Sequence, residues 1–236
     1  MSERMVTVVC VRHGQADHNV EGNKVFEYTQ EENPALDTNL TDVGRKQAVK
    51  VAERLAKTKF DLAISSDLRR AKDTAEAIRM KNETIKTVEE WREVRERRLG
   101  DFEGNAELCR AQLKVEDGVR DRSLLTWRIP NGESTVDLNE RIQRFLQILS
   151  KHVEEMTPAE PSILLVSHGI FLKELHRVLS GYSSHGYMFG LDDVHYGNTG
   201  VSHYSIWSKK TTGEILKTEC HEYACGAHIM SSIDGQ

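Results

Sequence analysis

The run Val6-Thr7-Val8-Val9-Cys10-Val11, followed directly by Arg12-His13-Gly14-Gln15, is the stretch that decides the fold of this chain. A short, continuous apolar run that ends in a polar turn is typical of a β-strand buried on both faces, as in parallel sheets covered by helices. Ligands of such open α/β sheets bind at the carboxyl ends of the strands, where the backbone N–H groups of the next turn are free. The stretch therefore predicts an imidazole and a guanidinium at a ligand-binding edge.

Two further segments repeat this order of apolar strand, polar turn and helix. Residues 60–66 predict a strand, and the apolar residues that follow it recur at helical spacing. Residues 163–166 predict another strand, which leads through Ser167-His168-Gly169 into a second helical pattern. We therefore predict an α/β fold, a three-layer αβα sandwich with a mostly parallel central sheet and helices on both faces.

The remaining elements are two helices and two strands. One helix is expected to start near Thr41 as its N-cap, and the other near Ser134 or Thr135, because hydroxyl side chains precede apolar residues at helical spacing. Residues 201–207 and 214–219 alternate in the manner of strands. These elements complete the predicted sandwich.

Length and composition favour one soluble domain over residues 1–236. The chain has 4 prolines and shows no repeat, so neither a linker nor an array is indicated. A net charge of -5 does not suit general binding to nucleic acid. No run approaches the ~20 apolar residues of a membrane span, and the amino terminus is polar, so we expect a cytoplasmic protein without a membrane partner.

The cysteines predict reduced thiols rather than disulfides or a metal site. They are Cys10, Cys109, Cys220 and Cys225. They are scattered, and the first lies in a predicted buried strand. The last two stand near His221 and His228, but this spacing matches no standard zinc pattern and fits an alternating strand better. We expect no metal and no cofactor.

The polar residues at the predicted strand ends have the chemistry of phosphoryl transfer. This reaction needs an aligned nucleophile, cations for the phosphoryl oxygens and a proton for the leaving oxygen. His13 is the candidate nucleophile, which would form a phosphohistidine. Arg12 and Arg70 would bind the oxygens with planar guanidinium groups, and His168 would donate hydrogen bonds to the same oxygens.

The candidate proton donors lie in the charged run from Trp91 to Gly100. Glu93 and Glu96 are both carboxylic acids within it, and their spacing does not choose between them. A solvated run of surface charges is the alternative interpretation of this segment.

Several motifs together resemble the histidine phosphatase superfamily, branch 1, which is also called phosphoglycerate mutase-like. The matching segments are Arg12-His13-Gly14-Gln15 with Asn19, Leu40 to Ala48, Ser65 to Ala75, Asn131-Gly132-Glu133-Ser134, and Val166-Ser167-His168-Gly169. The resemblance makes Arg70, not Arg69, the phosphate-binding arginine. It also selects Glu96 over Glu93, because the family's acid stands four residues before a glycine and a Glu-Gly pair follows.

The resemblance implies a set of site residues. The catalytic group is His13, Glu96, His168, Arg12 and Arg70. The implied phosphate- or substrate-binding group is Arg12, Asn19, Gln15, Arg70, His168, Gly169 and Thr199. Loop or strand-start roles are the alternatives for Gln15, Asn19 and Thr199. Ala16 departs from the family's frequent threonine, so one hydroxyl contact of the phosphate loop is missing.

Family members differ in the acceptor of the phosphoryl group and in the substrate. The short segment 104–130 and the pattern Asn198-Thr199-Gly200-Val201 look most like TIGAR-type phosphatases. This predicts a phosphatase for a small phosphorylated metabolite, such as fructose 2,6-bisphosphate or a bisphosphoglycerate. A phosphoglycerate mutase is the first alternative, and a non-catalytic phosphate-pocket protein is the second. We expect the irregular segments 20–38 and 180–197 to set substrate choice. The motifs carry no signal for an oligomeric state.

Overall fold

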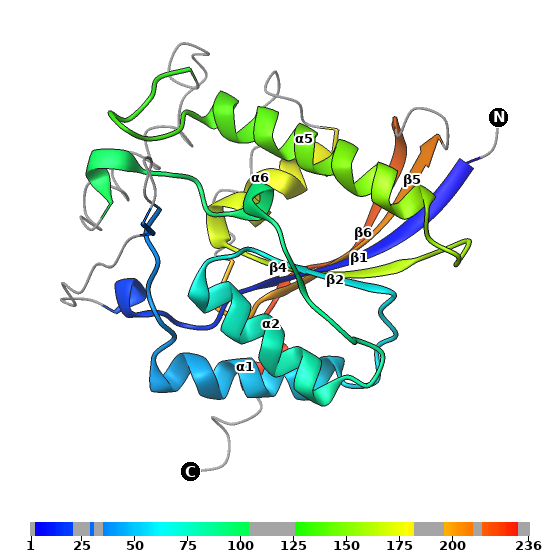
Figure 1. Ribbon diagram of the computed structural model, residues 1–236, viewed down its shortest axis with the longest axis horizontal. Helices are drawn as coiled ribbons and strands as arrows, with labels where there is room; N and C mark the ends of the chain where they lie inside the picture. Colours follow the sequence, from blue (N-terminus) through cyan, green and yellow to red (C-terminus); the bar gives the residue numbers. More distant parts are fainter. Residues whose placement is uncertain are drawn as a thin grey trace.

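The structure, a computed structural model, describes residues 3–20, 29–30, 35–103, 126–181, 196–209 and 214–230. Six strands in these ranges form one sheet in the order β3-β2-β4-β1-β5-β6 (Figure 1). Their bounds are β1 Glu3–Arg12, β2 Leu62–Ser65, β3 Glu89–Glu90, β4 Ser162–Ser167, β5 Val201–Lys209 and β6 Ile215–Cys225.

The sheet is parallel at its centre and on one side. Strand β4 pairs in parallel with both β1 and β2, and β2 pairs in parallel with β3. Strands β5 and β6 add an antiparallel hairpin beyond β1. The prediction of a mostly parallel sheet is therefore confirmed. Because Arg12 is in register with Ser167, the ends of β1 and β4 coincide and the residues that follow them lie side by side.

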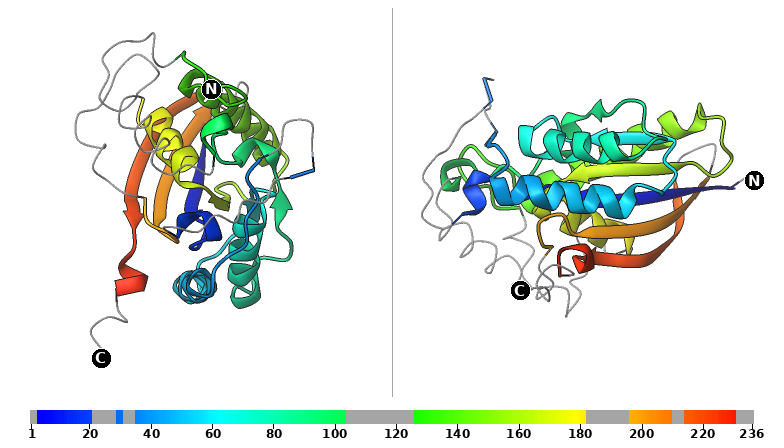
Figure 2. Two further views of the ribbon diagram at one scale, coloured as in Figure 1. Left: turned by 90° about the vertical axis from the view of Figure 1, so that its left-hand side faces the viewer. Right: turned by 90° about the horizontal axis from the view of Figure 1, so that it is seen from below.

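Helices cover both faces of the sheet. Helices α1 (Asp42–Leu55) and α2 (Arg69–Lys81) lie on one face, and α5 (Thr135–Glu154) and α6 (Gly169–Leu179) lie on the other (Figures 1 and 2). The short helices are η1 Asp17–Asn19, η2 Arg92–Val94, η3 Gly100–Phe102 and α7 Ala227–Met230. The three-layer prediction is confirmed. No helix in the described ranges is both long and apolar enough to cross a lipid bilayer.

Alternate residues of β1 supply two separate cores. Val8 and Cys10 pack with the apolar residues of α5 and α6. Val9 and Val11 pack with those of α1 and α2. Side chains of a strand point alternately to opposite faces of the sheet, so a strand between two helical layers needs apolar residues at every position. This explains the continuous apolar run of the sequence.

The predicted helix starts are confirmed. The Thr41 hydroxyl accepts a hydrogen bond from the backbone N–H of Gly44 at the start of α1. The Ser134 hydroxyl accepts one from the N–H of Asp137, whose carboxylate accepts one from the N–H of Ser134 in return. Each contact satisfies a backbone N–H group that has no partner within the helix.

Two features of the sheet differ from the expectation. Strand β6 continues to Cys225, beyond the expected end at residue 219, because it follows β5 through several register shifts. Strand β3 was not expected, since two residues carry no period. Most of segments 20–38 and 180–197, with Tyr182, Tyr187 and Phe189, lies outside the described residues, as do Cys109 and Gly104.

Candidate active site

His13 follows β1 directly and is buried, with 2% of its surface exposed. Its Nδ1 lies 2.7 Å from the carbonyl oxygen of Gly14. A carbonyl oxygen only accepts hydrogen bonds, so Nδ1 carries the proton and Nε2 keeps its lone pair. The backbone of His13 is held as well, because its carbonyl oxygen accepts from the N–H of Thr199 at 3.2 Å and from Nδ2 of Asn198 at 3.1 Å.

His168 occupies the equivalent position after β4. Its ring centroid lies 5.1 Å from that of His13, and the two rings are inclined by 60°. The ring is buried, and neither nitrogen has a hydrogen-bond partner within the described part of the chain. A buried polar nitrogen without a partner is costly, so this ring is suited to bind a polar ligand.

Arg12 and Arg70 approach the two histidines from different elements. Arg12 ends β1, and Arg70 lies in the first turn of α2. Each guanidinium is oriented by a carbonyl oxygen, that of Tyr196 at 2.5 Å for Arg12 and that of Leu36 at 2.7 Å for Arg70. The Nε atoms of both are buried and find no acceptor among the described residues. These N–H groups are available to an anion.

The charges at the site keep both imidazoles neutral. Burial lowers the pKa of His13 well below its usual value, and the charges of Arg70 and Arg12 lower it further. The pKa of His168 is lowered well below the usual value by burial and by the charge of Arg70. Burial lowers the pKa of Arg70 to about 10, so that guanidinium stays charged at neutral pH. Neutral imidazoles beside cations suit attack on an anion.

Glu96 belongs to the segment after η2, and its side chain lies against the amino-terminal end of α6, the helix that follows His168. Its carboxylate accepts hydrogen bonds from the backbone N–H groups of Ile170 at 3.1 Å and Phe171 at 3.0 Å. It also accepts one from the N–H of Arg97 at 2.9 Å. Burial lowers the pKa of Arg12 and of Arg70, and the negative charge of Glu96 partly offsets this lowering. The carboxylate therefore lies within electrostatic reach of both arginines.

The charged run from Trp91 to Gly100 is packed rather than solvated, so that alternative interpretation is wrong. Arg95 makes a paired hydrogen bond to Asp67, at 2.7 and 2.6 Å. Arg97 is 3% exposed. Glu93 directs its backbone carbonyl to Arg141.

The other predicted binding residues lie in the loops around His13. Gln15 accepts a hydrogen bond from the Thr41 hydroxyl at 2.8 Å, and Asn19 accepts one from the N–H of Ala16 at 3.0 Å. Thr199 is buried, and its backbone φ of 55° lies in the left-handed region. In this structure these side chains support the loops, and their contact with substrate stays a prediction.

Gly169 allows a close approach between the two strand ends. A Cβ atom at this position would lie 3.3 Å from Nε of Arg12. Its neighbour His168 is the N-cap of α6. The glycine thus lets the Arg12 guanidinium lie against the first turn of that helix.

His18 packs beside His13, although it is not among the residues that the family motifs imply for the site. Its ring lies 5.9 Å from that of His13, and its Nδ1 lies 2.6 Å from the Thr38 hydroxyl. Burial and the charges of Arg70 and Arg12 lower the pKa of His18 to about 3. Its position five residues after His13 in one loop was the available signal.

The residues near the carboxyl terminus belong to hydrogen-bond networks. Within the ranges that the structure describes, no group of three or more His, Cys, Asp or Glu side chains could hold a metal ion. Arg54 donates to Glu222, and His228 links Arg54 to the hydroxyl of Thr199 at 3.1 Å.

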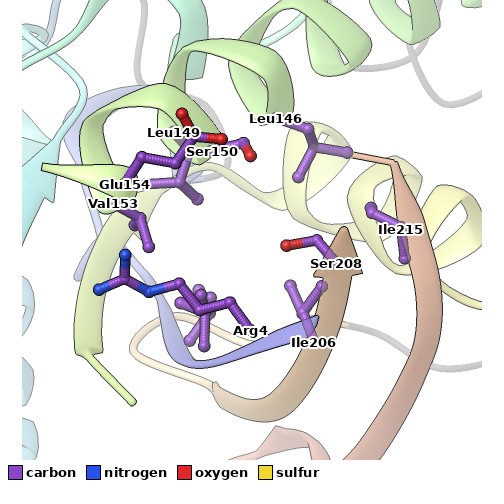
Figure 3. A pocket seen from close by; sticks show the side chains of 11 residues that line it. Arg4, Leu146, Leu149, Ser150, Val153, Glu154, Ile206, Ser208 and Ile215 are labelled. Carbon is purple, nitrogen blue, oxygen red and sulfur yellow. The ribbon is translucent and has the colours of Figure 1, made fainter. Parts of the chain in front are cut away.

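A small cavity lies far from the histidines, beside the first residues of β1 (Figure 3). It has a volume of about 40 Å³ and is lined mainly by apolar side chains of β1, α5, β5 and β6. Arg4 at its edge donates to the carbonyl oxygens of Met156 and Pro158, just beyond the end of α5. Cations favour a helix carboxyl terminus, so Arg4 has a structural role there.

The fold is of the α/β class, and the paired histidines beside two arginines have the composition of a phosphoryl-transfer site. The chain belongs to the histidine phosphatase superfamily, branch 1, whose family model matches residues 8–217. The family and its phosphatase members identify the chain as a phosphatase-class enzyme.

Similar proteins include both phosphatases and mutases. Glucosyl-3-phosphoglycerate phosphatase of Mycobacterium tuberculosis is 36% identical over 178 residues, which cover 73% of this chain and 74% of that protein. A 2,3-bisphosphoglycerate-dependent phosphoglycerate mutase of Bartonella bacilliformis is 32% identical over 183 residues, with 75% and 83% covered. The native structure of mycobacterial glucosyl-3-phosphoglycerate phosphatase matches with a TM-score of 0.70 at 27% identity, covering 95% of this chain and all of that one. These relatives do not single out the TIGAR-type phosphatases.

Proposed function

We propose that this enzyme hydrolyses the monoester of a small phosphorylated metabolite through a phosphohistidine on His13. One observation carries the proposal. The hydrogen bond from Nδ1 to the Gly14 carbonyl oxygen leaves Nε2 as the nucleophilic atom, beside the unpaired N–H groups of Arg12 and Arg70 and the ring of His168.

The first step forms the phosphoenzyme. Nε2 of His13 attacks phosphorus, a nitrogen–phosphorus bond forms, and the bond from phosphorus to the ester oxygen breaks. Arg12, Arg70 and His168 stabilise the phosphoryl oxygens. Glu96, in its protonated form, gives its proton to the leaving alkoxide oxygen.

The second step returns the enzyme to its starting state. Water attacks the phosphohistidine, and the Glu96 carboxylate accepts a proton from that water. The nitrogen–phosphorus bond breaks, and inorganic phosphate leaves. The neutral state of the His13 ring, maintained by burial and by the neighbouring arginines, suits it as nucleophile and as leaving group.

The names of similar proteins support a substrate class for this proposal. Their names specify glucosyl-3-phosphoglycerate, phosphoglycerate and, for a putative phosphatase of Hydrogenobacter thermophilus, phosphoserine. We infer a small metabolite of this kind as the substrate. Fructose 2,6-bisphosphate and 2,3-bisphosphoglycerate, which the TIGAR-type resemblance implies, remain candidates. The buried free thiol of Cys10 fits a reducing, cytoplasmic location.

Phosphate release across a substrate panel tests the proposal. The panel contains glucosyl-3-phosphoglycerate, both monophosphoglycerates, 2,3-bisphosphoglycerate, phosphoserine and fructose 2,6-bisphosphate, with His13→Ala as the blank. We expect turnover of at least one compound and a phosphoenzyme that is labile in acid and stable in base. Phosphate release by His13→Ala at the parental rate would refute the mechanism.

A mutase activity is the second candidate, because phosphoglycerate mutases are among the similar proteins. A mutase would exchange the phosphoryl group between the positions of a monophosphoglycerate, with hydrolysis as a minor product. Separation of the two isomers during the reaction distinguishes the activities. A non-catalytic phosphate-pocket protein would bind phosphate but turn over no compound of the panel.

A further inference from the structure

Arg141 of α5 uses its guanidinium to hold the backbone of the segment that carries Glu96. Its Nη1 donates to the carbonyl oxygens of Glu93 and Arg95, each at 2.8 Å. Its Nη2 donates to the carbonyl oxygen of Glu96 itself at 3.2 Å. One side chain therefore fixes three of the four carbonyl groups between residues 93 and 96.

Glu133 holds Arg141 in turn. Its two carboxylate oxygens accept from Nε of Arg141 at 2.9 Å and from Nη2 at 2.8 Å, and both side chains are nearly buried, at 10% and 12% exposure. A guanidinium has five N–H donors, and the five hydrogen bonds of Arg141 match that number. Lysine has three donors and no planar fork, so it would leave part of this arrangement unmade.

The same carboxylate is anchored to the segment beyond Glu96. Oε2 of Glu133 also accepts from the N–H of Arg98 at 3.0 Å, and its backbone carbonyl accepts from Nε of Arg97 at 3.0 Å. Burial raises the pKa of Glu133, but the hydrogen bonds from Arg141 outweigh this and leave it below the usual value. The pair is thus ionised and bonded on both sides of Glu96.

The side chain of Glu96 is fixed from the opposite direction, by α6. Phe171, whose N–H donates to this carboxylate, also places its ring 5.6 Å from the guanidinium carbon of Arg141. Helix α5 thus fixes the backbone of Glu96 while α6 fixes its carboxylate.

We propose that Arg141, held by Glu133, is the positioning residue for the proton donor Glu96. The inference rests on the proposed function, in which Glu96 protonates the leaving oxygen. A small displacement of a reacting group can cost about a hundredfold in rate. If Arg141 positions the proton donor, the loss of rate in an Arg141 variant should be larger for a leaving group that needs a proton. If Arg141 only supports the fold, the loss should be the same for all leaving groups.

The experiment compares two leaving groups in Arg141→Lys. Glycerol 2-phosphate releases an alkoxide that needs a proton, whereas p-nitrophenyl phosphate releases a phenolate that needs little help. We expect kcat for glycerol 2-phosphate to fall about tenfold more than kcat for p-nitrophenyl phosphate. In a Glu96→Gln background the added Arg141→Lys change should not alter the ratio further. Arg144→Lys, at an exposed position of the same helix, is the matched control and should retain both parental rates.

The outcomes distinguish a failure of the proposed role of Glu96 from a failure of the proposed role of Arg141. If Glu96→Gln itself slows both substrates equally, Glu96 is not the proton donor, and the proposed mechanism loses its acid. If Glu96→Gln shows the difference and Arg141→Lys, at an unchanged melting temperature, slows both substrates equally, the positioning role is overturned. Should Arg141→Lys unfold, Glu133→Gln is the second variant. It keeps one acceptor oxygen and should show the same difference to a smaller extent, and equal losses there also overturn the proposal.

Discussion

The ends of β1 and β4 carry the same residue type in different states. Each of these adjacent parallel strands is followed by a histidine and then a glycine, and the two ring centroids lie 5.1 Å apart. The ring of His13 is bonded to the Gly14 carbonyl oxygen, whereas both nitrogens of His168 lack a partner within the described residues. The first arrangement fixes the tautomer of His13, as a nucleophile requires, and the second leaves the single N–H donor and the lone pair of His168 to a ligand.

The difference arises from the chain that follows each strand. After β1 the backbone turns into a loop, and the N–H of Gly14 donates to the Thr74 hydroxyl at 3.0 Å. This orientation brings the Gly14 carbonyl oxygen to Nδ1 of His13. After β4 helix α6 begins at once, and its first N–H groups donate to Glu96 rather than to His168. The local backbone therefore decides whether each ring has a hydrogen-bond partner among the described residues.

Removal of the nucleophile should have the largest effect. His13→Ala deletes the atom that we propose accepts the phosphoryl group, so we expect kcat on the best substrate of the panel to fall by about 10⁴-fold or more. Quenched reactions with labelled substrate should show no phosphoenzyme. The exposed His221→Ala is the control and should keep the parental rate. A labelled phosphoenzyme in His13→Ala would place the nucleophile elsewhere.

Removal of the second ring should cost less, which tests the asymmetry of the two strand ends. His168→Ala deletes an N–H donor to the phosphoryl oxygens, and losses of about 10² to 10³ in kcat are typical for one such donor. The phosphoenzyme should still form, but slowly, in single-turnover experiments. His168→Gln keeps an N–H donor and should recover part of the rate. Equal losses at His13 and His168, with no phosphoenzyme in either variant, would contradict the division of roles.

The sequence could predict the two strand ends because they depend on local pattern. The apolar run before Arg12 and the run before His168 each predict a buried strand, and the parallel register then brings their ends together. Apolar spacing also predicts the helix whose first turn carries Arg70, but the choice of Arg70 over Arg69 came from family resemblance. Periodicity therefore sufficed for most of the site's framework.

The acid and the third histidine depend on contacts between distant residues. The choice of Glu96 over Glu93 came from family resemblance, and the bonds that fix its carboxylate come from Ile170 and Phe171, about 75 residues away. His18 reaches the site through the short helix η1 and a hydrogen bond to Thr38. Neither contact produces a periodic pattern in the sequence.

Substitution of the crowded Gly44 should displace the loop after β1 and leave the loop after β4 in place. A Cβ atom on Gly44 would lie 1.9 Å from the carbonyl oxygen of Gln15, so Gly44→Ala must shift the loop that carries His13. The helix propensity of alanine is better by about 1 kcal/mol, but overpacking against backbone typically costs about 1–3 kcal/mol. We expect kcat to fall by roughly 10- to 100-fold, with a lower melting temperature.

The control is Gly226→Ala, where a Cβ would meet no atom within 4 Å. It should preserve both the rate and the melting temperature. If Gly44→Ala retains the parental rate, the position of the β1 loop is not set by its contact with α1.

Acid should destabilise the protein through the histidines of the site. The folded-state pKa values of His13 and His168 lie well below the usual value, and that of His18 is about 3. An unfolded histidine binds a proton near pH 6.5, so below this pH the unfolded chain takes up protons that the folded protein does not. Stability conferred by these groups is present above pH 6.5 and is lost as the pH falls toward 3. The urea midpoint should therefore decrease as the pH is lowered from 7.5 to 4.5. In His18→Gln, the slope of the unfolding free energy against pH should fall by the equivalent of up to about one proton. An unchanged slope in His18→Gln would mean that this ring binds its proton equally well in the folded and unfolded chain, and would contradict both its burial and its closeness to the two arginines.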